Sequence, residues 1–232
     1  MAEQHHIGWF RERLAASLAI EPDDPSETLA WLRARRKDVP FSAELIALRD
    51  VAGWRQADNG NIQHDSGQFF RIEGVRVKSA PGLREVSGWD QPILTQPTGG
   101  VLALLCRETA RGVEFLLQAK ADPGNIGYLQ FCPTIQSTWE TIRGLENEGR
   151  VAFAECLEPS DNVRVIYRAS HNEEGSRFWR KSNENVILFV EDTGRLSIDG
   201  SVYRWASLTQ IKQMMLMDDI VGPYVRTVLA PL

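Results

Sequence analysis

The sequence of this 232-residue chain predicts an α+β fold, in which helices pack on a mixed β-sheet. Apolar and alternating runs typical of strands fill the middle of the chain, and helical spacing of apolar residues marks both of its ends. The sequence contains no internal repeat and no low-complexity linker. Because a chain of this length can bury a large core, we expect a helical arm over residues 1–50 and one sheet-containing module over residues 51–232.

The predicted arm contains two helices and a short third one. Residues 6–18 place apolar side chains at helical spacing. Residues 24–27 (Asp-Pro-Ser-Glu) combine a capping residue, a proline suited to the first turn and a capping-box glutamate. The second helix ends in the basic residues 33–37, which a helix C-terminus favours, so a solvated helix end explains them without a phosphate. We expect the short third helix over residues 41–48.

Alternating and apolar runs predict the strands. Asn59-Gly60 marks a hairpin within residues 54–64. Residues 67–77 and 85–94 follow as strands, and Pro92 confines the second of them to an edge or an end of its sheet. Further strands are expected over residues 101–106, 113–119, 131–135, 163–167, 186–190 and 201–205.

Two more helices are expected in the second half of the chain, over residues 148–157 and 207–217. The second begins with a capping serine and carries a methionine cluster, which we interpret as helix core. The last segment, residues 221–232, is compatible with a docked helix or with an extended chain.

The stretch from Gly112 to Thr138 combines strand ends with uncharged hydrogen-bonding side chains. One strand runs through Lys120 into Asp-Pro-Gly-Asn, where pairing stops abruptly. The apolar run 131–135 ends in a Gln-Ser-Thr sequence that starts at Gln136. Such side chains suit the rim of a pocket for a polyhydroxylated ligand, and they equally suit a hairpin with solvated ends.

Composition excludes several classes of protein. A formal net charge of -5 argues against a nucleic-acid-binding face, and no run approaches the roughly 18 apolar residues of a membrane span. The first residues lack the apolar core of a signal peptide, so we expect a cytoplasmic protein. The three cysteines are well separated and flanked by apolar residues, which predicts buried free thiols instead of disulfides or a zinc site.

Common catalytic motifs are missing from the sequence. It has no dinucleotide-binding glycine motif, P-loop, nucleophile elbow, paired-histidine zinc motif or Cys-x-x-Cys. Glu173-Glu174 is the one tight carboxylate pair in a predicted loop. It forms either a solvated turn or, together with His171 and Arg177, a general acid/base centre.

Five motifs in order carry a family resemblance: GQFFRIEGVRV, REVSGWDQPIL, FLLQAKADPGN, PTIQST and NEEGSRFW. From about His64 to Leu229, the chain resembles the NDP-hexose 2,3-dehydratases, which act in the biosynthesis of deoxysugars of natural products. The resemblance implies a Nudix-like fold without the metal-binding Nudix box, and hence no metal and no other cofactor.

The activity implied is a β-elimination on a TDP-4-keto-6-deoxyhexose. The C4 ketone acidifies the C3 proton, a base removes it, and the enolate expels the C2 hydroxyl to give a 3,4-diketo-2,6-dideoxy sugar. Such a reaction needs a base, an acid and a stabiliser of the C4 oxyanion. The alternative is a non-catalytic sugar-nucleotide-binding protein or a partner subunit of a pathway enzyme. A metal-dependent Nudix-type hydrolase ranks last, because its carboxylates are missing.

The resemblance also implies the site residues. Carried over by motif, they are Arg76, Trp89, Gln91, Gln118, Lys120, Asn125, Gln136, Glu174, Arg177 and Arg226. Lys120 is assigned to the keto oxygen or to proton transfer, and Glu174 is assigned as the base. Two arginines are assigned to the pyrophosphate (Arg177 and Arg226), and Trp89 is assigned to stacking on thymine.

Two departures from the family pattern bear on this reading. Family members contain two copies of the module and this chain contains one, so we expect an isologous homodimer. Residues 139–141 read Trp-Glu-Thr where an Asn-Tyr pair is expected, and residues 222–224 differ as well. Both segments fall near expected ligand contacts, so the sequence leaves open the sugar nucleotide and the reaction.

Overall fold

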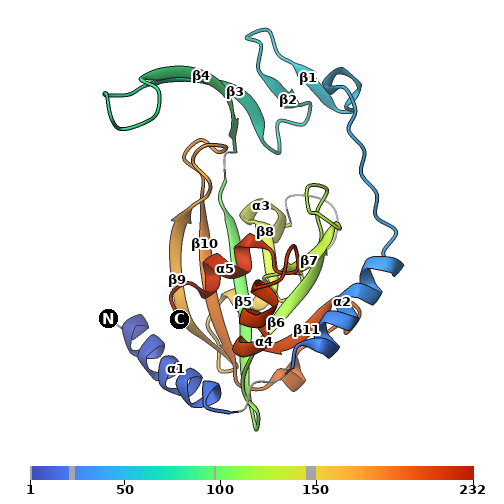
Figure 1. Cartoon of the computed structure of the whole chain (residues 1–232), viewed down its shortest axis with the longest axis vertical. Coiled ribbons are helices and arrows are strands. Elements are labelled where there is room, and N and C mark those ends of the chain that lie inside the picture. The colour runs from blue at the N-terminus through green and yellow to red at the C-terminus, as the bar shows by residue number, and fades with distance from the viewer. Residues whose placement is uncertain (1, 21–23, 97, 145–149) are drawn as a thin grey trace. The chain divides into compact units, whose positions relative to one another are not determined.

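A computed structural model describes residues 2–20, 24–96, 98–144 and 150–232 (Figure 1). It divides into two compact units. The large unit comprises Met1–Ala43, Gly100–Ser170 and Glu184–Leu232, and the small unit comprises Glu44–Gly99 and His171–Asn183. Helices and sheets coexist in it, which confirms the α+β class. Within the described ranges, no helix combines the length and the apolar character that crossing a membrane requires.

The large unit contains a seven-stranded sheet in the order β11-β6-β5-β10-β9, with β7 paired to β6 and β8 paired to β5. β5 pairs with β10 in parallel, and the pairs β6–β11, β5–β6, β5–β8 and β6–β7 are antiparallel. The strands are β5 (Gly100–Thr109), β6 (Gly112–Ala121), β7 (Leu129–Cys132), β8 (Ile135–Thr138), β9 (Val163–Asn172), β10 (Ser182–Val190) and β11 (Tyr203–Ser207).

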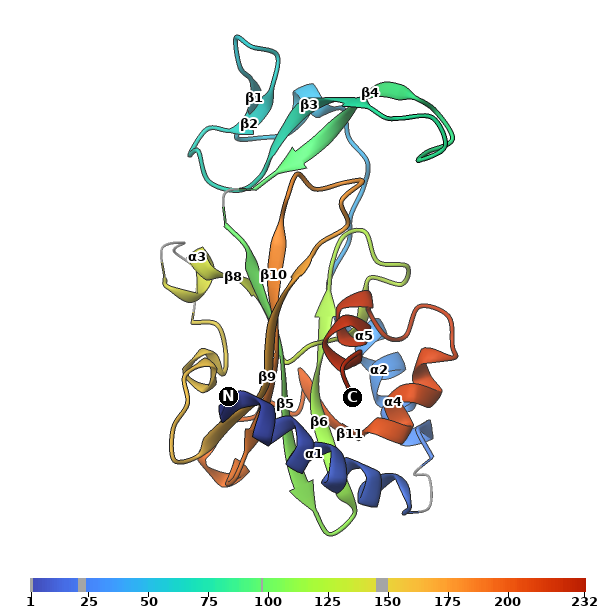
Figure 2. The same ribbon diagram turned by 90° about the vertical axis from the view of Figure 1, so that its left-hand side faces the viewer.

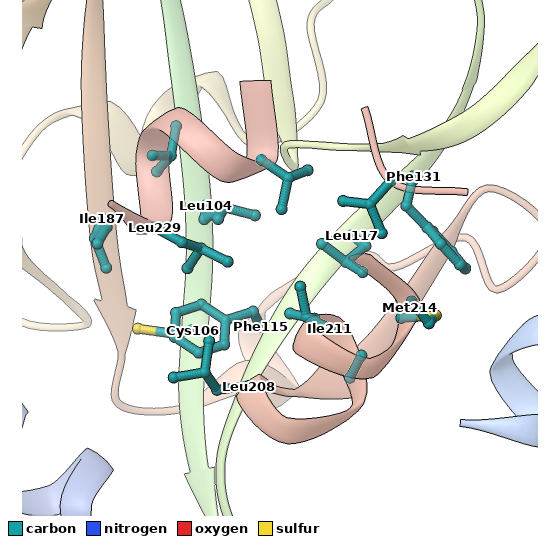
Figure 3. Close-up of a cluster of buried hydrophobic side chains, with 14 of the residues drawn as sticks. Leu104, Cys106, Phe115, Leu117, Phe131, Ile187, Leu208, Ile211, Met214 and Leu229 are labelled. Carbon is teal, nitrogen blue, oxygen red and sulfur yellow. The ribbon is translucent and has the colours of Figure 1, made fainter. Parts of the chain in front are cut away.

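Helices cover one face of this sheet. They are α1 (Ala2–Leu18), α2 (Ser26–Asp38), α4 (Leu208–Met215) and α5 (Pro223–Leu229). Figure 2 shows α1 and the C-terminal helices over this face, and Figure 3 shows the side chains that fill it, among them Phe115 and Leu117 from β6 and Ile211 from α4. Phe10 of α1 is fully buried in the same cluster, so the N-terminal helices contribute to the core of the large unit.

The opposite face of the sheet has its own apolar cluster, formed with α3 (Trp139–Ile142) and the 3₁₀ turn η2 (Ala154–Leu157). Leu105 and Leu116 point to this side, and Leu104 and Leu117 point to the helical face. The alternation places large apolar residues on both faces. This explains why the sequence reads as continuous apolar runs here and not as alternating ones.

The small unit is built on a four-stranded antiparallel sheet in the order β1-β2-β3-β4. Its elements are the 3₁₀ turn η1 (Leu48–Asp50), β1 (Trp54–Gln56), β2 (Ile62–His64), β3 (Arg71–Lys78) and β4 (Gly88–Thr95). The Asn59-Gly60 hairpin is confirmed, with Gly60 at a φ of +85°. Pro92 lies in β4 at the end of the strand order, as expected of a residue that cannot donate a ladder hydrogen bond.

Three predicted helices turned out differently. Residues 41–47 are not helical, and only η1 follows them. Leu45 and Ile46 are exposed there, so a helix would have no packed face to stabilise its few turns. The helix predicted over 148–157 is reduced to η2, because Phe153 adopts a φ of +63° that breaks helical continuity, and residues 148–149 lie outside the described residues. The helix predicted over residues 207–217 ends earlier than expected, at Met215.

The capping serine and the helix-core methionine are confirmed, whereas the strand predicted over residues 131–135 is divided between β7 and β8. Ser207 caps α4 through a capping box with Gln210, in which each side chain bonds the other residue's backbone. Met214 is fully buried, as a helix-core methionine should be, whereas Leu216 beyond the helix is 87 % exposed. The open alternative for the C-terminal segment is settled as a helix, α5, with Pro223 in its first turn.

Thr134 stands where the central strand changes its partner. β5 pairs with β8 up to Ala103 and with β6 from Leu105 onward, so the two neighbouring strands diverge at this point. The Thr134 hydroxyl accepts from the Leu105 N–H at 3.0 Å and donates to the Leu116 carbonyl. Thr134 is 1 % exposed, so this bridge replaces ladder hydrogen bonds inside the core.

Replacing Thr134 by valine keeps the shape of the side chain and removes its hydroxyl. We expect the free energy of unfolding to fall by about 1–3 kcal/mol, because buried backbone groups lose their partner. Urea titration measures this. Thr134→Ser is the matched control: it keeps the hydroxyl and gives up one methyl group, at a cost of about 1 kcal/mol. A valine variant as stable as the wild type would contradict the role of the hydroxyl.

Candidate functional site

The ten site residues predicted from the sequence fall into both units. The large unit contains Gln118, Lys120, Asn125, Gln136 and Arg226, and the small unit contains Arg76, Trp89, Gln91, Glu174 and Arg177.

In the large unit, the polar residues lie where the split sheet ends. Lys120 stands opposite Gln130 in the β6–β7 ladder, and Gln118 stands opposite Cys132. The Lys120 ammonium donates to the Gln136 backbone carbonyl at 3.2 Å, so the structure brings these two predicted residues together. The Gln136 Oε1 atom is buried and has no hydrogen-bond partner among the described residues. Such an acceptor is stabilised when a ligand hydroxyl or amide donates to it.

A cleft of about 530 Å³ lies beside β7. Its polar lining residues are Asn125, Gln130, Asp218, Asp219 and Arg226. We call it the large-unit cleft. The lining therefore places two predicted residues, Asn125 and Arg226, at one cavity. Amides, carboxylates and a guanidinium together offer both donors and acceptors, as a polyhydroxylated ligand requires.

The wall of the large-unit cleft is fixed by backbone pairing and by an arginine that the sequence analysis assigned to a solvated helix end. The Phe131 N–H donates to the Ile220 carbonyl (2.9 Å), which joins the segment before α5 to β7. Arg36 donates from Nε to the Leu129 carbonyl (2.9 Å) and from Nη2 to the Asp219 carbonyl (2.6 Å). Burial lowers the pKa of the Arg36 guanidinium from its usual value. Arg36 is therefore a structural tie at this cleft.

A second cleft, of about 460 Å³, lies within the small unit. We call it the small-unit cleft. It is lined by Val75, Val77, Arg84, Trp89, Gln91, Ile93, Asn172, Gly175, Ser176, Phe178, Trp179 and Arg180. The Trp89 indole N–H donates to Gln91 Oε1 at 2.7 Å, and Gln91 Nε2 donates to the Ser176 carbonyl at 2.8 Å. The structure thus joins two predicted residues into one hydrogen-bonded wall.

Arg76 is held by a carboxylate of its own sheet. Its guanidinium bonds Asp90 through two nitrogens, at 3.0 Å from Nε and 2.8 Å from Nη2. This hydrogen bonding lowers the pKa of the Asp90 carboxyl and raises the pKa of Arg76. Arg76 lines a further cleft of the small unit, of about 420 Å³, together with Asn61 and Glu73.

The two glutamates of the predicted carboxylate pair have different surroundings. Glu174 is exposed on the loop after β9 and accepts a hydrogen bond from Ser176 Oγ. The Glu173 side chain is 7 % exposed and accepts from Lys181 Nζ (2.9 Å) and Asn183 Nδ2 (2.8 Å). Exposed Glu174 therefore agrees with the prediction that this pair lies in a loop. The Glu173 side chain instead holds the start of the loop through its bonds to Lys181 and Asn183.

Arg177 lies on the same exposed loop. Its carbonyl accepts the Leu94 N–H, and the Leu94 carbonyl accepts the Trp179 N–H, both at 2.8 Å. This pairing attaches the loop to β4. Trp179, Arg180 and Lys181 follow on the same loop and are not among the predicted site residues, although the motif NEEGSRFW contains Trp179.

A mixed sheet in one unit and an antiparallel sheet in the other, each with clefts and the first packed with helices, define an α+β protein. The chain belongs to the NDP-hexose 2,3-dehydratase family, whose model matches residues 25–232. This confirms the resemblance drawn from the five motifs.

Curated relatives agree with this membership. The chain is 34 % identical over 236 residues to a dTDP-4-dehydro-6-deoxy-alpha-D-glucopyranose 2,3-dehydratase of Amycolatopsis orientalis, covering 97 % of this chain and 48 % of that protein. Proteins of the same name from Streptomyces violaceoruber and Saccharopolyspora spinosa are 34 % and 29 % identical, each covering 88 % of this chain. The alignments cover 45 % and 41 % of those two proteins, respectively. The chain thus spans less than half the length of each relative.

A crystal structure of a C. elegans Ap4A hydrolase aligns with 57 % of this chain and 96 % of that one, with 12 % identity and a TM-score of 0.35. A TM-score of this size does not define a shared fold.

The three thiols should resist modification in the native protein. All three cysteines are buried, as predicted, and burial raises the pKa of Cys132 to about 12 and of Cys156 to about 11. The pKa of Cys106 also lies well above its usual value. Because the thiolate is the reactive form, we expect no labelling by Ellman's reagent at pH 8 within minutes, and labelling of all three thiols in guanidinium. Native-state labelling at the rate of free cysteine would contradict this account.

Proposed function

We propose that this protein is a sugar-nucleotide 2,3-dehydratase, which eliminates water from a TDP-4-keto-6-deoxyhexose to give a 3,4-diketo-2,6-dideoxy sugar nucleotide. One observation carries the proposal: the family match runs over residues 25–232, which include every residue lining the two clefts. The names of the curated relatives supply the substrate and the reaction.

The chemistry divides into tasks that the described side chains are suited to perform. Removal of the C3 proton requires a carboxylate open to the ligand, and Glu174 is exposed and carries no ion pair among the described residues. Charge that develops on the C4 oxygen requires a cation or a donor, which the Lys120 ammonium supplies. Expulsion of the C2 hydroxyl requires proton transfer from an acid. We propose Glu174 as the base and Lys120 as the oxyanion stabiliser or proton donor.

The remaining predicted residues are proposed to bind the substrate. In the large unit these are Gln118, Asn125, Gln136 and Arg226, and the unpartnered Gln136 Oε1 favours a ligand donor. In the small unit they are Arg76, Trp89, Gln91 and Arg177. We propose Arg177 and Arg226 as ligands of the pyrophosphate and Trp89 as a stacking surface for thymine. On this proposal residues 51–232 form the catalytic module and residues 1–50 the helical arm.

A second function is a sugar-nucleotide-binding protein or a partner subunit without its own turnover. The observation that favours it is the departure from the family pattern at residues 139–141 and 222–224. Both functions require binding of the sugar nucleotide, so turnover separates them.

The test is incubation of the purified chain with TDP-4-keto-6-deoxyglucose and a chelator, followed by mass spectrometry of the nucleotide products. The proposal expects loss of one water, trapped as the diketo sugar nucleotide or as its breakdown products. Binding of the substrate with no loss of water would support the partner-subunit function and contradict the dehydratase.

Lys120→Ala and Glu174→Ala should each lower turnover by about a hundredfold to ten-thousandfold, which is the usual contribution of a positioned acid, base or donor. Affinity for TDP and the midpoint of thermal unfolding should change little. Lys212→Ala and Glu158→Ala are matched controls, because both residues are exposed and neither belongs to the five motifs that contain Lys120 and Glu174. A double variant of Lys120 and Glu174 with wild-type turnover would end the assignment.

We further propose that the protein acts in the cytoplasm as an isologous homodimer. Several large apolar side chains are exposed in the described chain, among them Phe69, Leu83 and Leu216, and such residues suit a surface between copies. Sedimentation at micromolar concentration should therefore give a dimer of the 26.2 kDa chain. A strictly monomeric species would refute the dimer.

A further inference from the structure

The connection between β9 and β10 carries Glu174, and its two ends are joined to each other. Glu173 is the first residue after β9, and Lys181 is the last residue before β10. The Glu173 N–H donates to the Lys181 carbonyl at 2.9 Å, and the Lys181 ammonium lies 2.9 Å from Glu173 Oε2. A backbone hydrogen bond and an ion pair therefore close the loop at its base. We call these two contacts the loop clamp.

The ion pair of the loop clamp is shielded from solvent. The side chains of Glu173 and Lys181 are only 7 % and 12 % exposed. Asn183, itself buried, donates from Nδ2 to the same Glu173 oxygen at 2.8 Å. An exposed ion pair contributes little, whereas breaking a buried pair leaves a charge without compensation. The loop clamp can therefore hold one geometry, which an ion pair in solvent would not do.

Hydrogen bonds connect the loop clamp to the backbone of Glu174. The Glu174 carbonyl accepts the N–H of Arg177 (3.0 Å) and that of Phe178 (2.9 Å). The Phe178 ring in turn faces the Lys181 ammonium, with 4.7 Å between Nζ and the ring centre. Glu174 is thus fixed on one side by its neighbour Glu173 and on the other by a turn that packs on Lys181.

The backbone bends sharply at the far end of the loop. Arg180 has a φ of +50°, in the left-handed region that non-glycine residues seldom occupy. Such a conformation persists only where the surrounding structure determines it. Lys181, the next residue, is held by the ion pair, so the loop clamp is one source of this constraint.

We propose that Glu173 and Lys181 are positioning residues, whose buried ion pair holds the loop so that the Glu174 carboxylate meets the C3 proton of the substrate. The proposal rests on the proposed function, in which Glu174 is the base. Neither positioning residue lines any of the described clefts, so they act through the loop and not by touching the ligand. Geometry of this kind matters, because a misplacement of about 1 Å can cost about a hundredfold in rate.

The first test is steady-state kinetics of Glu173→Gln and Lys181→Met, which remove one charge each and keep the size of the side chain. Each variant should lower kcat by about tenfold to hundredfold, because the base is no longer held in place. KM and the affinity for TDP should stay within about twofold of wild type, since the ligand contacts are untouched. Lys181→Arg, which keeps a cation opposite Glu173, should retain most of the wild-type kcat.

A double-mutant cycle separates positioning from general damage. In the Glu174→Gln background the base is already absent, so Glu173→Gln should slow removal of the C3 proton by less than about twofold. In the wild-type background the same change should slow it by at least about tenfold. An equally large loss in both backgrounds would show that Glu173 does not act through Glu174, and it would overturn the proposal.

Glu114→Gln is the matched control for loss of a buried ion pair. Glu114 is 4 % exposed and lies 2.7 Å from Arg107, in the large unit and outside the loop. This variant should lower the midpoint of thermal unfolding and leave kcat of the folded protein unchanged. If it lowers kcat as much as Glu173→Gln does, the effect is general destabilisation and the positioning role is wrong.

Trypsin provides a readout that does not require activity. Arg177 and Arg180 are exposed on the loop, and cleavage after them requires the loop to open locally. Glu173→Gln should speed cleavage at these two sites by about tenfold and leave the other sites unchanged, as mass spectrometry of the fragments will show.

The two readouts distinguish this inference from the dehydratase proposal. If the wild type removes no C3 proton, the dehydratase is contradicted, and trypsin cleavage still decides whether the loop clamp orders the loop. If the wild type eliminates water while Glu173→Gln and Lys181→Met keep wild-type kcat, and Glu173→Gln is cleaved at the wild-type rate, the dehydratase stands and the positioning role is overturned.

Discussion

The large unit depends on one buried hydroxyl, that of Thr134. The central strand β5 must pair with β8 at one end and with β6 at the other, and the hydroxyl bridges Leu105 and Leu116 where the partners change. Without such a bridge, a split sheet would leave buried backbone groups unpaired, at a cost comparable to a lost hydrogen bond. Because β6 and β8 separate at this point, the side chains at their ends have different neighbours. This is how Lys120 Nζ reaches the carbonyl of Gln136.

The two units offer opposite chemistry to a ligand. The large-unit cleft presents amides, carboxylates and Arg226, which suits hydroxyl groups that both donate and accept. The small-unit cleft presents indole faces and guanidinium groups, which suits a flat base and an anion. The family to which the chain belongs is named for sugar-nucleotide substrates.

Local pattern predicted the elements whose stability is local. Alternation, Asn59-Gly60 and the Ser207 cap predicted strands, a hairpin and a helix start, all of which the structure contains. The helices wrongly predicted over residues 41–48 and 148–157 lacked a packed face or met a left-handed residue, whereas the missed contacts join residues distant in sequence. Arg36 looks like a solvated helix end until its partners, Leu129 and Asp219, are brought to it. The wall of the small-unit cleft likewise joins groups 85 positions apart, and no periodicity records such a contact. The predicted site residues were taken from sequence motifs, which give positions in the chain and do not specify the neighbours of each side chain.

The central claim is that this chain carries its own base for the C3 proton, and exchange of that proton tests it most directly. Proton NMR of TDP-4-keto-6-deoxyglucose in deuterated buffer follows the C3 signal, whether or not elimination goes to completion. The account predicts that the wild-type protein removes the C3 proton, either by exchange for deuterium or with loss of water, and that Glu174→Gln does so at least a hundredfold more slowly, since the amide cannot accept the proton. Loss of the C3 proton by neither route with the wild type, or equal loss with both proteins, would contradict it.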